Sequence, residues 1–97
     1  MKLSKPRGLG YQGTKLWDAI TAEYDLELEP DKIRILEDAC RTADWIQKLD
    51  AEAKNAPLTV KGSMRQPVIN PLLAQVQTER ERLSRFLSRL NFAPMED

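Results

Sequence analysis

Apolar residues recur at helical spacing over most of the chain, and the longest such stretch runs from Asp31 to Asn55. Because a surface helix needs an apolar stripe of only about 100°, the wider arc of roughly 200° in this stretch predicts packing on two sides. Pro30 suits the first helical turn and Pro57 ends the helix. The arc consists of Ile33, Ile35, Leu36, Ala39, Cys40, Ala43, Ile46, Leu49 and Ala53.

The polar face of this stretch carries acids and bases four residues apart. Glu37 precedes Arg41 and Asp44 precedes Lys48, which is the favourable order for an ion pair on a helix. We therefore expect both pairs to form on a face turned to water.

A shorter helix is predicted over residues 15–24, with Thr14 as its cap. Residues 25–29 alternate acids with Leu26 and Leu28, and we expect an extended linker whose leucines turn inward. This linker is too long and too acidic for the turn of a DNA-reading helix-turn-helix. The apolar face of the short helix consists of Leu16, Trp17, Ile20 and Tyr24.

Beyond the long helix, residues 58–60 and 64–66 flank Lys61-Gly62-Ser63 and predict a small β-hairpin or an ordered loop. Asn70 then predicts the cap of a last helix, with Pro71 at its first position.

The last helix has an apolar seam at alternating spacings of three and four, broadened by Leu72 and Phe86. The seam predicts antiparallel packing against the long helix, with the seam arginine reaching a carboxylate. Its members are Leu73, Val76, Arg80, Leu83, Leu87 and Leu90.

These elements predict an all-α fold: a short N-terminal helix, then a long antiparallel helical hairpin with a small β-hairpin or loop between its helices. Residues 1–13 are predicted to form a flexible basic arm, and residues 14–92 a single helical oligomerisation domain. Residues 93–97 are predicted to form a short acidic tail, and Phe92, just before the tail, is a possible anchor. A chain of 97 residues has a thin core, so the wide arc favours a homo-oligomer over a monomeric hairpin. The expected core and interface residues are Ile35, Leu36, Ala39, Ala43, Ile46, Leu49, Leu73, Val76, Leu83 and Leu87.

Composition narrows the chemistry. There is no histidine, and the single cysteine, Cys40, lies on the apolar arc, so we expect a core thiol and no metal site. No carboxylate is placed beside a partner as general acid–base catalysis requires; we therefore expect no enzyme and no cofactor. The lack of a long apolar run or signal-peptide pattern favours a soluble intracellular protein.

Net charge is zero, yet charge is sorted along the chain. Residues 1–15 carry four bases and no acid, whereas residues 16–31 carry six acids and no base. We interpret this as an arm and a docking surface, in which the acidic stretch holds the basic arm until DNA competes for it. Simple repulsion of a neighbour is the alternative.

Two sets of basic residues are candidates for contact with DNA phosphates, and ordinary solvated or acid-paired side chains are the alternative for each. The first set is Lys2, Lys5, Arg7, Lys15, Lys61 and Arg65. The second is a stripe on the last helix formed by Arg82, Arg85 and Arg89, in which Glu79 can pair with Arg82 and Glu81 with Arg85.

Five short motifs in order resemble a known family. The chain is similar, from about Gly8 to Pro94, to the short small terminase subunits of tailed phages and prophages of actinobacteria. The motifs are Gly8-Leu9-Gly10, then Leu16-Trp17-Asp18 through Tyr24-Asp25-Leu26, then residues 36–44 (LEDACRTAD), then Val60-Lys61-Gly62-Ser63, and then Asn70-Pro71-Leu72-Leu73 before an Arg- and Leu-rich helix.

The resemblance implies a non-catalytic component of a viral DNA-packaging motor in the host cytoplasm. Such subunits form rings, bind double-stranded viral DNA at the packaging start site, and pass it to the large terminase subunit, which holds the ATPase and nuclease. Many relatives read DNA with an N-terminal helix-turn-helix, which this sequence lacks. The rival interpretation is a small helical oligomeric protein-interaction module without nucleic-acid binding, which the zero net charge favours.

Overall fold

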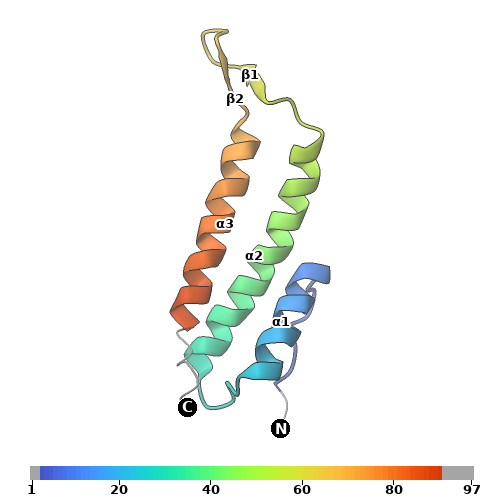
Figure 1. Cartoon of the computed structure of the whole chain (residues 1–97), viewed down its shortest axis with the longest axis vertical. Helices are drawn as coiled ribbons and strands as arrows, with labels where there is room; N and C mark the ends of the chain where they lie inside the picture. The colour runs from blue at the N-terminus through green and yellow to red at the C-terminus, as the bar shows by residue number, and fades with distance from the viewer. Residues whose placement is uncertain (1–2, 91–97) are drawn as a thin grey trace.

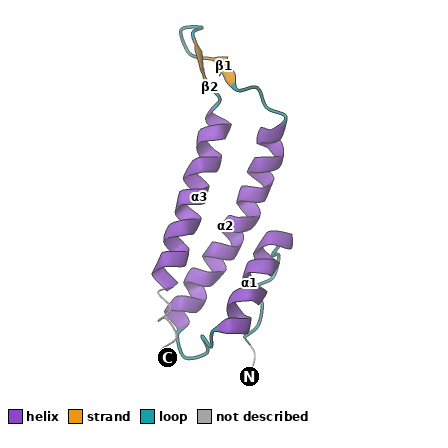
Figure 2. Cartoon of the chain, in the orientation of Figure 1, coloured by secondary structure: helices purple, strands orange, loops and turns teal. Residues whose placement is uncertain are grey.

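The computed structural model describes residues 3–90 as three helices and a two-stranded hairpin (Figures 1 and 2). In chain order these are α1 (Tyr11–Glu23), α2 (Pro30–Lys54), β1 (Thr59–Lys61), β2 (Pro67–Ile69) and α3 (Pro71–Leu90). Helix α2 is central, with α1 on one side and α3 on the other (Figure 1). The predicted antiparallel helical hairpin with a small β-hairpin is confirmed, and the molecule is elongated, with extents of 57 × 28 × 22 Å.

The wide apolar arc of α2 is covered from within the same chain. Its two sides face α1 and α3, which confirms the predicted two-sided packing. A second subunit is therefore not needed to bury the arc. The width of the arc, from which we predicted self-association, does not support that prediction. Of the expected core and interface residues, the structure buries Leu36, Ala39, Ile46, Leu49 and Val76, half-buries Ile35, Ala43, Leu73 and Leu83, and leaves Leu87 37% exposed.

Helix α1 begins at Tyr11, four residues before its predicted start, and Thr14 is not its cap. The Asp44 carboxylate of α2 accepts the backbone N–H groups of Gly10 at 2.7 Å and of Gly13 at 2.8 Å. It thereby satisfies donors that a local cap would otherwise serve. Residues 11–13 are thus part of a helix rather than of a flexible arm, and Asp44 does not pair with Lys48.

Glycine permits this close approach of α1 to α2. Gly13 is buried, and a Cβ added there would lie 2.7 Å from the Cys40 carbonyl oxygen and in collision with the Asp44 carboxylate. A Cβ added at Gly10 would lie 2.9 Å from an Asp44 carboxylate oxygen, a somewhat less severe contact. The two glycines set the position of α1 on α2.

The linker between α1 and α2 is a turn rather than an extended segment. Asp25 Oδ1 accepts the Glu27 N–H at 3.0 Å, and the Leu26 carbonyl accepts the Glu29 N–H at 3.0 Å. The turn buries Leu26 at 1% exposure but leaves Leu28 94% exposed. The prediction that both leucines turn inward is therefore wrong for Leu28.

Asn70, at the base of the β-hairpin, forms hydrogen bonds both with the start of α3 and with the segment that follows α2. Its Oδ1 caps α3 by accepting the Leu72 N–H at 3.0 Å, as predicted, and its Nδ2 donates to the Pro57 carbonyl at 2.9 Å. The strands pair antiparallel, with Val60 opposite Val68. The second strand starts at Pro67, so residues 62–66 form the loop.

The seam of α3 is shifted by one residue at two predicted positions. Glu79 is 4% exposed whereas Arg80 is exposed, and Phe86 is half-buried whereas Leu87 is exposed. The apolar residues of α3 are compatible with burial of either position 79 or position 80. In the structure, packing on α2 buries Glu79 and leaves the Arg80 guanidinium at the surface. Arg80 Nη2 lies 2.6 Å from Asp50 Oδ2, which confirms the predicted carboxylate partner.

The fully buried core lies where all three helices meet, at the end opposite the β-hairpin (Figure 1). Leu3 and Leu9 of the N-terminal segment pack against it, half-buried. The core cluster consists of Trp17, Leu26, Leu36, Cys40 and Leu90. Phe92 and the acidic tail at 93–97 lie outside the described residues.

Candidate nucleic-acid interface

The β-hairpin presents Lys61 and Arg65 at one end of the long axis of the molecule (Figure 1). Two backbone hydrogen bonds close the loop between the strands. The Gly62 N–H donates to the Gln66 carbonyl at 2.7 Å, and the Arg65 N–H donates to the Gly62 carbonyl at 2.9 Å. Both cations are exposed, and neither has an ion pair within residues 3–90. The hairpin tip is thus a small positive surface open to solvent.

Arg65 adopts φ 62°, the only positive φ of a non-glycine residue between residues 3 and 90. The left-handed region costs an ordinary L-residue about 1–2 kcal/mol relative to glycine. The turn therefore uses an arginine where glycine would be the unstrained choice.

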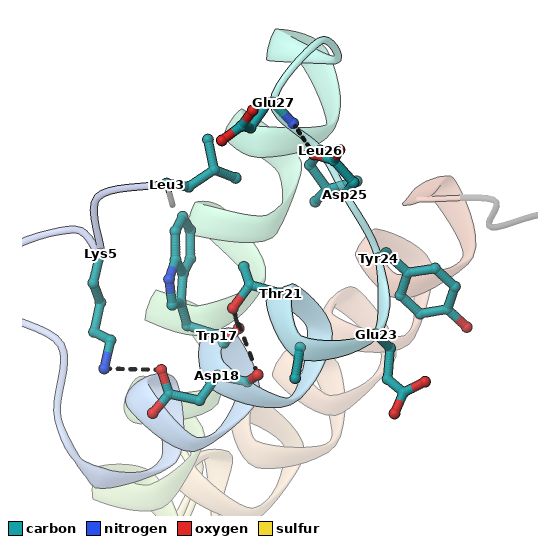
Figure 3. Close-up of a pocket in the computed structure, with 11 residues that line it drawn as sticks. Leu3, Lys5, Trp17, Asp18, Thr21, Glu23, Tyr24, Asp25, Leu26 and Glu27 are labelled. Carbon is teal, nitrogen blue, oxygen red and sulfur yellow. Dashed lines mark hydrogen bonds and ion pairs between the residues drawn. The ribbon is translucent and has the colours of Figure 1, made fainter. Parts of the chain in front are cut away.

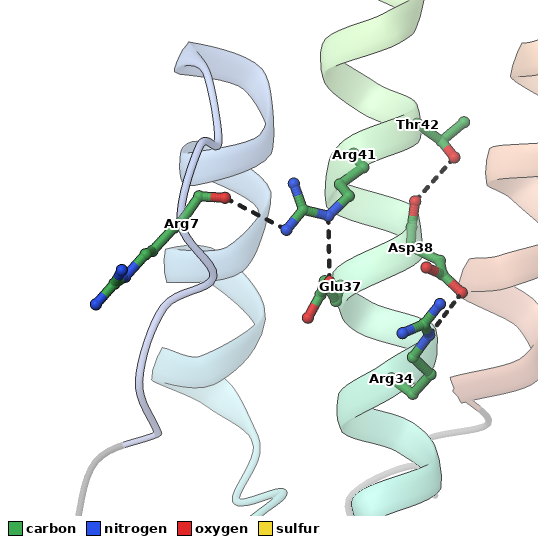
Figure 4. Close-up of polar contacts among 6 residues, drawn as sticks. All are labelled: Arg7, Arg34, Glu37, Asp38, Arg41 and Thr42. Atoms are coloured by element: carbon green, nitrogen blue, oxygen red, sulfur yellow. Dashed lines mark hydrogen bonds and ion pairs between the residues drawn. The ribbon is translucent and has the colours of Figure 1, made fainter.

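The N-terminal candidates lie in the other half of the molecule. Lys5 Nζ is 2.9 Å from Asp18 Oδ1 on α1, and the Arg7 carbonyl accepts a hydrogen bond from Arg41 Nη2 at 3.3 Å. The Arg7 side chain itself points away from α2 (Figure 4). Lys15 is exposed on α1, and Lys2 lies outside the described residues.

These two groups of cations do not form one surface on a single chain. Lys5, Arg7 and Lys15 lie along α1, whereas Lys61 and Arg65 lie beyond the far end of α2 (Figure 1). A polyanion that contacts both groups on one chain has to follow the long axis of the molecule.

The arginine stripe on α3 is partly neutralised. Arg82 Nη1 lies 3.2 Å from the buried Glu79 Oε1, which confirms one predicted pair, while Gln75 donates to the same oxygen at 2.9 Å. The predicted pair between Glu81 and Arg85 is not formed. Arg85 and Arg89 are exposed, and the structure gives them no ion pair with any residue from 3 to 90.

Trp45 was not among the predicted site residues, because it lies outside the apolar arc of α2 and belongs to no basic cluster. It is 48% exposed and borders a groove of about 330 Å³ between α2 and α3. Arg41, Arg82 and Phe86 also line this groove, together with Asp38, Thr42 and Glu79. On α2, Arg34 pairs with Asp38 and Arg41 with Glu37, as predicted for the second pair (Figure 4).

The acidic stretch of the sequence surrounds a larger pocket of about 790 Å³ at the opposite end from the hairpin (Figure 3). Its apolar lining includes Leu3, Trp17 and Leu26, and Lys5 is the one basic lining residue in the part of the chain that the structure describes. The carboxylates that line it are Asp18, Glu23, Asp25 and Glu27.

Cys40 is a core residue, as predicted. It is fully buried, and burial together with the nearby carboxylates of Asp44 and Glu37 raises the pKa of its thiol to about 12. A thiol with this pKa is a poor nucleophile near neutral pH. Within residues 3–90, no three His, Cys, Asp or Glu side chains are placed so that they could hold a metal ion, and no helix has the length and apolar character of a membrane span.

Comparison of the chain with protein-family models, with curated protein sequences and with solved structures gives no match.

Proposed function

We propose that this chain is a small terminase subunit: a non-catalytic protein that forms a homo-oligomer, binds double-stranded viral DNA and passes it to the large terminase subunit in the host cytoplasm. The observation that supports the proposal most is the hairpin tip, where Lys61 and Arg65 are exposed without a carboxylate partner among residues 3–90. Basic side chains on a protruding loop reach a phosphate backbone without a folded pocket.

The backbone of Arg65 adds to this support. Its φ of 62° is strained for an arginine, and strain of this kind concentrates at functional positions. Glycine would relieve the strain but would remove the guanidinium. We infer that the side chain is kept for a contact that it makes outside the chain.

Repetition of the tip around an oligomer would make weak contacts effective. Two cations on one chain give low affinity for DNA, but copies held in one assembly bind at a high effective concentration. The apolar residues exposed around the hairpin, rather than the arc of α2, are the proposed subunit contacts. They are Leu58, Met64 and Ile69, at 67%, 84% and 61% exposure.

The test is the solution mass of the protein by light scattering, with and without duplex DNA, at low and at physiological salt. We expect one high-order oligomer whose mass increases with DNA, less so as salt rises, because phosphate contacts release counterions. A monomer or dimer that is indifferent to DNA at both salt concentrations would contradict the proposal.

The second candidate is a helical protein-interaction module that binds no nucleic acid. The half-exposed Trp45 beside the α2–α3 groove favours it, because tryptophan and arginine are typical of protein interfaces. High-order assembly without any response to DNA in the light-scattering experiment would support this candidate over the first.

A further inference from the structure

Residues 3–7 form a strap that lies along α1 and borders the acidic pocket (Figures 1 and 3). Leu3 packs against the core cluster, and Lys5 reaches Asp18 at 2.9 Å. On the other side of the strap, Arg41 holds the Arg7 carbonyl (Figure 4). Gly8, at φ 82°, forms the turn that leads from the strap to α1.

The pocket has an excess of negative charge. Among residues 3–90, four carboxylates line it, and Lys5 is the only cation. Two of its apolar lining residues are buried, Trp17 at 3% and Leu26 at 1% exposure. Such a pocket attracts a cation and repels phosphate.

The Lys5–Asp18 pair has the strength that a reversible contact requires. Both side chains are well exposed, at 40% and 59%. Exposed pairs of this kind shift an equilibrium by a factor of about 1.5 to 5. A phosphate backbone, which carries many charges, can compete with a single carboxylate at that level.

We propose that the strap is a displaceable latch. In the free protein Lys5 pairs with Asp18. When duplex DNA binds, the strap turns at Gly8, and Lys5 leaves Asp18 and contacts the phosphates together with Arg7. This inference rests on the proposed DNA binding. The Lys5 ammonium cannot contact Asp18 and a distant phosphate together. The pair with Asp18 thus lowers the affinity for a polyanion by a factor of about 1.5 to 5.

The test is a double-mutant cycle of Asp18→Asn and Lys5→Gln, with the affinity for a labelled duplex read by fluorescence anisotropy. Glu23→Gln is the matched control, since it removes the same charge from the same pocket without touching Lys5. We expect D18N to tighten DNA binding by about 2- to 5-fold. E23Q should change the logarithm of the affinity by less than half as much. In the background of K5Q, D18N should bring no gain. Equal gains in D18N and E23Q, or a gain that persists with K5Q, would overturn the latch in favour of general repulsion.

Hydrogen exchange of residues 3–7 separates failure of the latch from failure of the proposed function. Without DNA, exchange in the strap should be faster in D18N than in E23Q, and unchanged exchange would overturn the latch even if DNA binds. Faster exchange in D18N with no DNA binding by any variant would overturn the proposed function and the role of DNA, while the contact with Asp18 stands. Release of the strap by a hexalysine peptide but not by duplex DNA would overturn DNA as the trigger and assign the pocket to a basic protein segment.

Discussion

The two ends of this molecule are built differently. At one end, three helices enclose Trp17, Leu26, Leu36 and Leu90, all at 3% exposure or less. At the other end, α2 and α3 pack only on each other and lead to a two-stranded hairpin with exposed apolar residues. Because an isolated hairpin is marginally stable in water, stability is concentrated at the first end and the second end is left to make contacts.

The largest expected effect compares the same substitution at the two ends of α2. Leu36 is fully buried among three helices, whereas Leu49 is 8% exposed against α3 alone. We expect Leu36→Ala to lower the free energy of unfolding by about 3–5 kcal/mol and Leu49→Ala by about 2–3 kcal/mol, because the cavity at Leu36 is more enclosed. Urea unfolding followed by far-UV circular dichroism, at one protein concentration, measures both. A larger loss for L49A would mean that the hairpin end carries the stability.

The next effect concerns how α1 is attached to the core end. Asp44→Ala removes the acceptor of two backbone N–H groups at the start of α1, and we expect a loss of about 1–2 kcal/mol. Thr14→Ala should stay within about 0.5 kcal/mol, because Thr14 does not cap the helix. The same urea titrations measure both variants. If T14A lowered the free energy of unfolding as much as D44A does, Thr14 would have to cap the helix after all.

Elements with strong local signals were predictable from the sequence. Pro30, Asn70 and Pro71 mark helix starts through local chemistry, and α2 and α3 begin within one residue of the predicted positions. The start of α1 was not predictable, since its acceptor, Asp44, is 31 to 34 residues away in the chain. The register of α3 was also ambiguous, because the seam alone does not say whether Glu79 or Arg80 is buried.

The candidate site was predicted without its individual contacts. The sorted charges predicted that the acidic stretch holds the basic arm, and the structure shows the pair of residues that meet, Lys5 and Asp18. The distance between the two basic groups, and the exposure of Trp45, depend on how helices of unequal length pack. Local patterns do not contain that information.

The smallest expected effect lies in the hairpin itself. Arg65→Gly removes the strain of the left-handed backbone but adds freedom to the unfolded chain, so we expect a net local stabilisation of about 0.5 kcal/mol. Hydrogen exchange of the Gly62 and Arg65 amides, which close the loop, should slow by about twofold. Faster exchange in R65G would show that the arginine side chain stabilises the loop, and would remove the reason for assigning it an external contact.

The most direct test of the central claim is the salt dependence of duplex binding by Lys61→Gln/Arg65→Gln, compared with Lys48→Gln/Lys54→Gln on the exposed face of α2. Each lost phosphate contact lowers the slope of log affinity against log salt by about 0.9. We predict that K61Q/R65Q weakens binding and reduces the slope by about 1.8 for each subunit in contact, while K48Q/K54Q leaves the slope unchanged. An unchanged slope in K61Q/R65Q would contradict the assignment of the hairpin tip to DNA, and a reduced slope in Arg85→Gln/Arg89→Gln would then move the interface to α3.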